Sequence, residues 1–310
     1  MTIADDIVTS ETPDAKAAPV ETPLQRFVSE FFENKLSTIA LVTLAIIILL
    51  AIIAPWIVPQ NPYDLAQVDV LDSRLPPGEK NSVSGYTYWL GTDGAGRDLL
   101  SAMLYGVRIS LAVGVMSGLI AMVIGAAVGL IAAYAGGRTE SLIMRIVDLQ
   151  LSFPAILLAL MLIAVLGKGI DKIIIALVTV QWAYYARTVR ANALVESRKE
   201  YVEAARCLGL SHGRIMARHI MPNCLPPLIV VATVQTAHAI ALEATLSFLG
   251  VGLPQTEPSL GLLISNGFEY MLSGKYWISF FPGIVLLITI MTINLVGDQL
   301  RDVLNPRLKR

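Results

Sequence analysis

Charged residues are scarce in this 310-residue chain. Asp, Glu, Lys and Arg together supply 15% of it, whereas an ordinary soluble domain contains about a quarter. Hydrophobic residues supply 55%, and the mean hydropathy is +0.65. This composition excludes an ordinary soluble domain and predicts a protein that lies in a bilayer. The net charge of -1 gives no sign of a nucleic-acid partner, so we expect none.

Cysteine and histidine are also rare. The two cysteines, Cys207 and Cys224, and the three histidines have neither disulfide nor zinc-site spacing. The sequence lacks a G-x-x-x-x-G-K-[ST] motif for nucleotide phosphates. It also lacks the nucleophile, base or metal cluster that an enzyme embedded in the membrane needs. We therefore expect no metal, no cofactor and no catalysis by this chain, and any ATP must be hydrolysed by another protein.

Six apolar segments predict an all-α, polytopic membrane protein. About 20 helical residues cross a hydrocarbon core of roughly 30 Å. The weakest of the six segments, 173–186, is the fourth in chain order and is short. Flanking Lys172 and Arg187 and aromatic residues are typical of a membrane interface, so the span could be longer than this segment. The other five segments are 36–58, 109–135, 149–167, 225–250 and 276–297.

The distribution of Lys and Arg predicts the orientation. With both termini inside, sixteen of these residues lie on the inner side and seven on the outer side, so the positive-inside rule favours cytoplasmic termini. We divide the chain into a disordered tail (1–35), a first helix with an extracytoplasmic loop (36–102), a core (103–300) and a basic cytoplasmic C-terminus (301–310). The first apolar run is too long for a signal peptide, so we expect it to remain as a span.

A short basic segment between the fourth and fifth spans, residues 200–223, has the pattern helix, glycine break, helix, proline stop. We call it the docking segment; it belongs to a predicted cytoplasmic loop, 196–223. Gly209 predicts a C-cap, Ser211 the N-cap of a second helix, and Pro222 the start of the next element. Four residues at i, i+3, i+4 and i+7 predict one apolar face on the first helix: Tyr201, Ala204, Ala205 and Leu208.

Two polar positions interrupt the fifth span. Glu243 is the only acidic residue well inside a predicted span, and Gln235 lies in the same span. Such residues face protein or a water path, so both are candidates for a translocation path or gate. For Glu243 we favour a structural or gate-lining role over contact with cargo. The alternative class is an ion-coupled secondary transporter. Such a transporter usually has several polar or ionisable groups near the midplane, whereas Glu243 is the only acidic residue well inside a span here.

Small and polar residues make two further patterns. Four glycines of the second span lie on one helical stripe, which predicts close helix packing inside the bundle or at a dimer seam: Gly114, Gly118, Gly125 and Gly129. In the outer loop, the spacing of acids and glycines lacks a calcium-loop pattern, so we predict a folded turn with Arg97 paired to a carboxylate. The residues of this turn are Gly91, Thr92, Asp93, Gly96, Arg97 and Asp98.

From residue 36 onward, these motifs resemble the membrane subunits of ABC importers, in particular the C-type permease of the dipeptide, oligopeptide and nickel importers. The family's EAA loop corresponds to Glu203-Ala204-Ala205, Gly209 and Met221-Pro222, with Met in place of the usual Leu. Its Gly-Thr-Asp and Gly-Arg-Asp signature corresponds to the outer turn, and its Leu-Ser-Phe-Leu-Gly turn to residues 246–250. One departure is Leu260-Gly261, where relatives often have Trp before Gly.

The resemblance implies a type I ABC importer fold in the bacterial inner membrane. It implies that Glu203 makes a polar contact to an ATPase, that Ala204 and Ala205 pack closely, and that Gly209 forms the bend. The implied partners are a B-type permease subunit, two ATP-binding subunits, an extracytoplasmic substrate-binding protein and the lipid bilayer. The implied cargo is a di- or oligopeptide. Nickel, glutathione and opine-type conjugates are the alternatives within the family.

Overall fold

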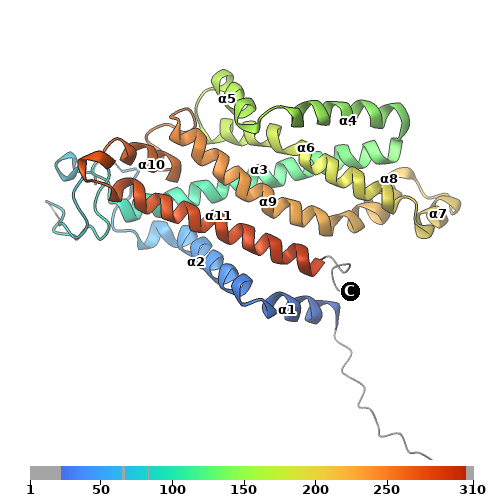
Figure 1. The fold of residues 1–310 in the computed structure, drawn as a ribbon, viewed down its shortest axis with the longest axis horizontal. Helices are drawn as coiled ribbons and strands as arrows, with labels where there is room; N and C mark the ends of the chain where they lie inside the picture. Colours follow the sequence, from blue (N-terminus) through green and yellow to red (C-terminus); the bar gives the residue numbers. More distant parts are fainter. Residues whose placement is uncertain (1–21, 65–66, 83, 305–310) are drawn as a thin grey trace, which may run out of the picture.

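The computed structural model describes residues 22–64, 67–82 and 84–304, and these residues form a bundle of helices without an extended strand. The predicted all-α fold is thus confirmed. At the centre, α3 (Leu99–Ala135), α6 (Ile170–Glu196) and α9 (Met221–Phe248) pack together (Figure 1). On one side lie α2 (Lys35–Ile57) and α11 (Trp277–Leu304), and on the other lie α4 (Gly137–Ser152) and α5 (Ala155–Leu166).

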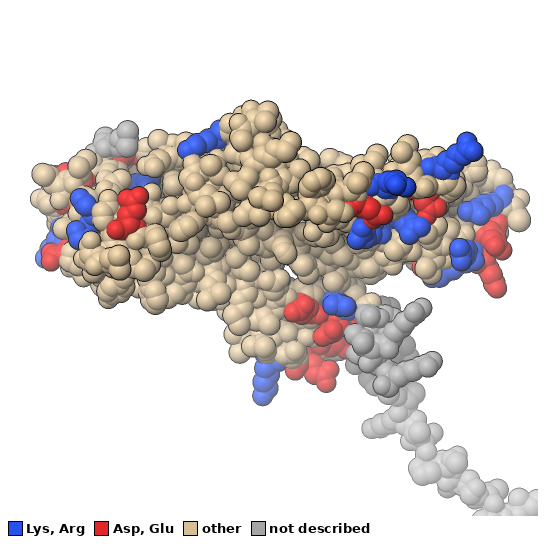
Figure 2. Space-filling view, turned by 45° about the horizontal axis from the view of Figure 1, so that its top comes forward, with Lys and Arg blue, Asp and Glu red and all other residues tan. Residues whose placement is uncertain are grey.

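Shorter elements occupy the two ends of the bundle. The docking segment contains α7 (Glu200–Cys207), α8 (His212–Ile215) and a π-helical turn, η2 (Met216–Ile220). The opposite end, which we call the loop end, carries α10 (Leu260–Phe268) and the turns η1 (Val70–Asp72) and η3 (Met271–Ser273) (Figure 1). Charged side chains gather toward the ends and leave a broad uncharged zone between them on the face that Figure 2 shows. This distribution suits a protein that crosses a membrane.

Four helical segments of the described chain are long and apolar enough to cross a membrane, and the bent pair α4 and α5 makes a possible fifth. The four are Lys35–Ile57, Leu99–Ala135, His212–Phe248 and Trp277–Leu304. The helix α6 has 27 residues, about 40 Å at 1.5 Å per residue, but it carries polar groups such as Gln181 and Arg187. The short segment predicted at 173–186 is therefore only the middle of a much longer helix.

The segment 149–167, predicted as one helical span, is not a continuous helix. The chain bends by 92° between α4 and α5, at Phe153 and Pro154. A residue before proline is driven out of the helical region by the proline ring, and Phe153 has φ -87° and ψ 139°. The apolar run therefore continues in a new direction after Pro154, which places α5 across the side of α6.

Three other predicted boundaries change. Within the predicted disordered tail, the chain forms α1 (Pro23–Glu33), which Thr22 caps by accepting a hydrogen bond from the Gln25 amide (3.3 Å). Residues 1–21 and 305–310 lie outside the described residues. The boundary at 102 falls inside α3, because this helix begins directly after Asp98. The fifth span, predicted to begin at residue 225, begins earlier, because α9 starts at Met221 and contains Pro226 and Pro227.

Within the bundle, the glycine stripe of α3 packs against α6 and α9. A Cβ on Gly129 would lie 2.3 Å from the carbonyl oxygen of Ala186, and one on Gly125 would lie 2.3 Å from that of Trp182. Backbones this close leave no room for a side chain. A Cβ on Gly114 would lie 2.7 Å from the Ile240 side chain of α9. The stripe therefore serves packing within this chain, the first of the two predicted roles.

We predict that Gly129→Ala separates α3 from α6 and destabilises the fold by about 1–3 kcal/mol, the usual cost of overpacking. Gly283→Ala in α11 is the matched control, because a Cβ there meets nothing within 4 Å. Thermal stability of the purified chain in detergent, measured as the fraction that stays monodisperse after heating, checks both variants. Equal stability of the two variants would contradict the packing role.

Candidate functional site

The docking segment projects from the bundle as two short helices with a glycine bend between them (Figure 1). Gly209 has φ +71°, a conformation that favours glycine. The amide of Leu210 donates to the carbonyl of Ala205 (3.2 Å), and the amide of Gly209 donates to that of Arg206 (3.0 Å). These bonds close the end of α7 as predicted. Ser211 lies at the N-cap of α8, but its side chain makes no capping hydrogen bond.

The helix α7 has a buried face and an exposed face. Val202 and Ala205 are buried and pack with Ile215 of α8 and Cys224 of α9. The exposed face contains Ala204 and Leu208, and Leu208 is 80% exposed. The predicted apolar face is thus divided: Ala205 anchors the helix within the chain, whereas Ala204 and Leu208 stay accessible. An exposed leucine beside a small residue on a rigid helix can fit a groove of another protein.

The remaining predicted residues of this segment surround that face. Glu203 is exposed and forms no ion pair with the described part of the chain. Its carboxylate can therefore bind a donor on another protein. Met221 is partly buried against the cluster formed by Val202, Ala205, Ile215 and Cys224. Pro222 is exposed in the first turn of α9. The helix α9 continues directly from η2, because Ile220 is helical and the Met221 amide donates to the Met216 carbonyl.

A hydrogen-bond network joins α7 to the ends of α6 and α9. The Tyr201 hydroxyl donates to the Glu196 carboxylate (2.7 Å), which also binds Lys199 Nζ (2.7 Å). Asn223 Nδ2 donates to the same hydroxyl (3.1 Å). Burial raises the pKa of Tyr201 to about 12, and the Glu196 carboxylate adds to this effect, so the hydroxyl keeps its proton at neutral pH. Sequence reasoning missed this network, because its members are spread over three elements.

At the loop end, the predicted outer turn, residues 91–98, is a buried turn held by hydrogen bonds. Asp93 accepts hydrogen bonds from Arg97 Nε (2.7 Å) and from the Arg97 amide (3.0 Å), which confirms the predicted pairing. The Thr92 hydroxyl accepts from the Leu75 amide (2.7 Å), and Asp98 caps α3 by accepting from the Ser101 amide (2.8 Å). Removing one partner of a buried ion pair leaves an uncompensated charge, so these groups hold the loop in shape.

The two glycines of this turn are required by its backbone. Gly91 has φ +81° and Gly96 has φ +86°. A Cβ on Gly96 would lie 2.1 Å from the carbonyl oxygen of Asp69, and one on Gly91 would lie 2.6 Å from that of Leu75. Both the dihedral angle and the close approach exclude a side chain. The outer motif is therefore explained by folding of the loop, without any ligand.

Glu243 and Gln235 have different environments. The Glu243 side chain is fully buried, and its oxygens accept hydrogen bonds from the hydroxyls of Ser110 (2.9 Å) and Ser247 (2.8 Å). It ties α9 to α3 and lines neither of the cavities beside α9, which supports its structural role. Gln235 lines both of these cavities.

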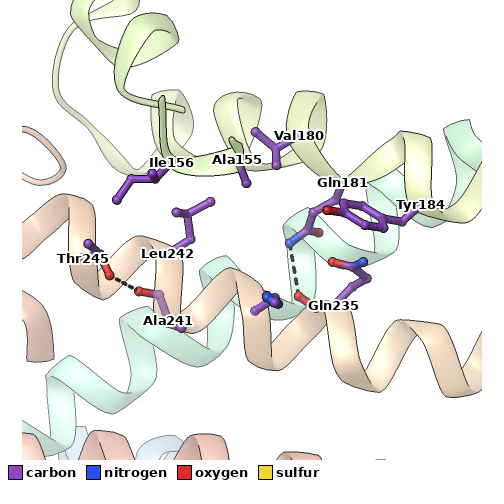
Figure 3. Close-up of a pocket in the computed structure, with 10 residues that line it drawn as sticks. Ala155, Ile156, Val180, Gln181, Tyr184, Gln235, Ala241, Leu242 and Thr245 are labelled. Carbon is purple, nitrogen blue, oxygen red and sulfur yellow. Dashed lines mark hydrogen bonds between the residues drawn. The ribbon is translucent and has the colours of Figure 1, made fainter. Parts of the chain in front are cut away.

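One cavity of about 340 Å³ lies between α5, α6 and α9 (Figure 3). We call it the upper cavity. Its polar lining comes from Gln181, Tyr184, Gln235, His238 and Thr245. A larger groove of about 970 Å³ continues from it along α6, α9 and α11, and shares Tyr184, Gln235 and His238 with it. The groove also contains Glu196 and Lys199 of the Tyr201 network, so the docking segment and the groove share residues.

Gln181 is the cavity residue that sequence reasoning missed. It is a single amide among apolar residues of α6, and a polar residue in the middle of a spanning helix is the signal that could have indicated it. For metals, the described residues contain no group of three or more His, Cys, Asp or Glu side chains. Both cysteines are free thiols; Cys207 is exposed and Cys224 is buried.

The architecture defines the class of protein. Several apolar helices, a groove along the bundle and a short helical projection at one end are features of a multi-pass membrane transport subunit. Residues 125–310 match the family described as the binding-protein-dependent transport system inner membrane component, and residues 22–77 match the N-terminal TM domain of oligopeptide transport permease C. The chain belongs to this family of inner-membrane permease subunits, and the resemblance to C-type ABC importer permeases is confirmed.

Similar proteins extend over nearly the whole chain. The dipeptide transport system permease protein DppC of Escherichia coli (strain K12) is 41% identical over 95% of this chain and 97% of its own length. The di/tripeptide transport system permease protein DppC of Pseudomonas aeruginosa is 36% identical, with 93% of each chain covered. The subunit of the inward-facing MetNI methionine ABC transporter has a similar fold, with TM-score 0.55 and 24% identity over 67% of this chain and 98% of that one.

We predict that Tyr201→Phe loosens α7, because the hydrogen bond to the Glu196 carboxylate and the one from Asn223 are lost. A bond to a charged group contributes about 1.5–3 kcal/mol, so amide hydrogen exchange in residues 200–207 should become about tenfold faster or more. Tyr276→Phe is the control, since the Tyr276 hydroxyl bonds to no described residue. Unchanged exchange in Tyr201→Phe would show that the network does not hold the helix.

Proposed function

We propose that this chain is the permease subunit through which an ATP-driven importer moves di- and oligopeptides across the inner membrane. The observation that carries the proposal is the exposed face of α7, where Leu208 is 80% exposed and Glu203 has no ion-pair partner in the described chain. A nucleotide-binding motif is absent from the sequence, so any ATP that drives transport must be hydrolysed by another protein.

Two ATP-binding subunits are the partners that this face suits. Leu208 and Ala204 would enter an apolar groove on the ATPase, and Glu203 would bind a donor at its rim. When the ATPases close, the displacement of α7 would pass through Tyr201 and Glu196 to α6, and through η2 to α9. Both helices line the groove, so a rigid shift of α7 changes the shape of the groove and supports alternating access.

A second permease subunit and an extracytoplasmic binding protein complete the proposed complex. The groove along α6, α9 and α11 is open on one side, and a B-type permease would close it into a path. The hydrogen-bonded turn at residues 91–98 keeps the loop end rigid, as docking of a binding protein requires. This arrangement needs both termini and the docking segment in the cytoplasm, with α4 and α5 together as one of six membrane passages.

The names of the relatives support peptides as the cargo, because the similar proteins of E. coli and P. aeruginosa are named for dipeptide and for di- and tripeptide transport. The described residues contain no group of three or more His, Cys, Asp or Glu side chains, so they add no support for nickel as the cargo. Glutathione and opine-type conjugates contain amide or carboxylate groups that the groove would also accept. Ligand analysis of the binding protein purified from cells would separate these cargoes.

Ion-coupled transport is the alternative class, and Glu243 is the residue on which it would depend. Its carboxylate is fully buried and bonded to Ser110 and Ser247, and it lines neither cavity beside α9. A coupling site must exchange its ion with water during each cycle, so this location favours ATP-driven import. Uptake should persist when the proton gradient is collapsed and stop when ATP is depleted.

The two native cysteines allow a direct test of orientation. We predict that a membrane-impermeant maleimide labels Cys207 in inside-out vesicles but not in intact cells, because the exposed α7 would face the cytoplasm. Cys207→Ser should abolish the labelling, since Cys224 is buried. Addition of the purified ATP-binding subunits should slow the reaction. Labelling of Cys207 from outside intact cells would overturn both the orientation and the ATPase contact.

We also predict that Leu208→Ala lowers ATP-driven uptake by about tenfold or more, because truncating a central interface residue commonly costs 2 kcal/mol or more. Leu142→Ala on α4 is the matched control: this leucine is also exposed, at 65%, but lies outside the docking segment. Uptake and ATP hydrolysis by the purified complex measure the effect, and recovery of the permease from membranes controls for expression. Equal uptake by both variants would contradict docking through α7.

A further inference from the structure

The upper cavity contains an unsatisfied hydrogen-bond acceptor. Gln181 is 2% exposed, and its Nε2 donates to the backbone carbonyl of Gln235 across the cavity (3.1 Å, Figure 3). A carbonyl only accepts, so this bond fixes the orientation of the Gln181 amide. The other amide atom, Oε1, then has no hydrogen-bond partner among the described residues. Leaving a buried polar atom unpaired costs about 1–3 kcal/mol, so such an atom calls for an explanation.

The lining of the cavity limits what could pair with Oε1. Its ten lining residues include no Asp, Glu, Lys or Arg. An ammonium group placed there would have no carboxylate to compensate it, and burying an unpaired charge costs far more than burying a neutral amide. The missing donor is therefore uncharged, either an N–H or an O–H group. A peptide bond provides one, whatever side chains flank it.

The neighbouring groove, unlike the upper cavity, is lined by charged residues. It contains cations and anions together, among them Arg187, Lys199 and Arg301 with Glu196 and Asp298. Charges of both signs suit the ammonium and carboxylate ends of a zwitterionic peptide. Because the groove and the upper cavity share Tyr184, Gln235 and His238, a short peptide could contact both. Glu196 lies 15 residues beyond Gln181 on α6, about 22 Å at 1.5 Å per residue, so a dipeptide would meet the amide of Gln181 and the charges of the groove in turn as it moves.

We propose that Gln181 is a specificity residue that accepts a hydrogen bond from the backbone N–H of the peptide in transit. This inference rests on the proposed peptide import and adds the group that the membrane subunit recognises. A contact to the backbone, in a cavity without fixed charge, tolerates any side chain. The permease would thus select for a peptide bond, while selection among peptides is left to the binding protein.

The test compares two cargoes in the complete complex, reconstituted in vesicles with its binding protein. One cargo is an ordinary dipeptide, and the other is the same dipeptide with an N-methylated peptide bond, which has no N–H to donate. Gln181→Leu should lower uptake of the ordinary dipeptide about tenfold, the factor that corresponds to 1.4 kcal/mol at 25 °C. It should change uptake of the methylated cargo less than about twofold, because the wild type makes no such bond with it.

Thr245→Val is the matched control in the same cavity. The Thr245 hydroxyl already donates to the carbonyl of Ala241 (2.7 Å, Figure 3), so its removal should leave the ratio of the two uptake rates unchanged. Gln181→Leu would overturn the inference if it lowered both uptake rates equally or left both unchanged. Absence of dipeptide uptake by the wild-type complex would instead overturn the proposed peptide import.

A second measurement needs no variant, in case Gln181→Leu does not assemble. A dipeptide with a diazirine side chain, irradiated during ATP hydrolysis by the wild-type complex, should attach to α5, α6 or α9. Mass spectrometry should find the adducts within residues 155–156, 180–184 or 235–245, the stretches that contain the lining of the cavity. Adducts confined to other parts of the chain would overturn the inference. Excess unlabelled dipeptide should reduce the specific adducts.

Discussion

The contact between the backbones of α3 and α6 is the constraint on which the other features depend. Gly125 and Gly129 let the two helices meet with no side chain between them. Close-packed backbones move together, so α6 is held against α3 along much of its length. Other sides of α6 contact α9 and α5, and the upper cavity forms between these three helices. The docking segment starts where α6 ends, so the same contact also sets its position.

The docking segment has an inner anchor and an outer surface on one short helix. Val202 and Ala205 bury one side of α7, while Ala204 and Leu208 leave the other side accessible. A helix of eight residues is too short to be stable alone in water, so it depends on this anchor and on the Tyr201 network. The same dependence makes it a stiff connection, because α7 cannot shift without moving the ends of α6 and α9.

Local features of the sequence were predicted well, and features that depend on neighbours were not. The bend at Gly209 and the pairing of Arg97 with Asp93 follow from residues within four positions of each other, and both are confirmed. Burial of Ala205, by contrast, depends on Ile215 and Cys224, which fold back onto α7. The break at Pro154 carries a local signal, but apolar composition obscured it, because hydropathy does not record the direction of a helix.

The sequence by itself determined the class of this protein: its apolar segments need a bilayer, its motifs match those of importer permeases, and it lacks a nucleotide-binding motif. The tertiary structure alone decided which polar residues meet. Glu243 and Gln181 are both buried polar residues in long helices, yet Glu243 is satisfied by two serines whereas Gln181 keeps one acceptor unpaired at a cavity. Ser247 is one turn from Glu243 on α9, but Ser110 and the Gln235 carbonyl lie on other helices than Glu243 and Gln181, at distances along the chain that no local pattern encodes.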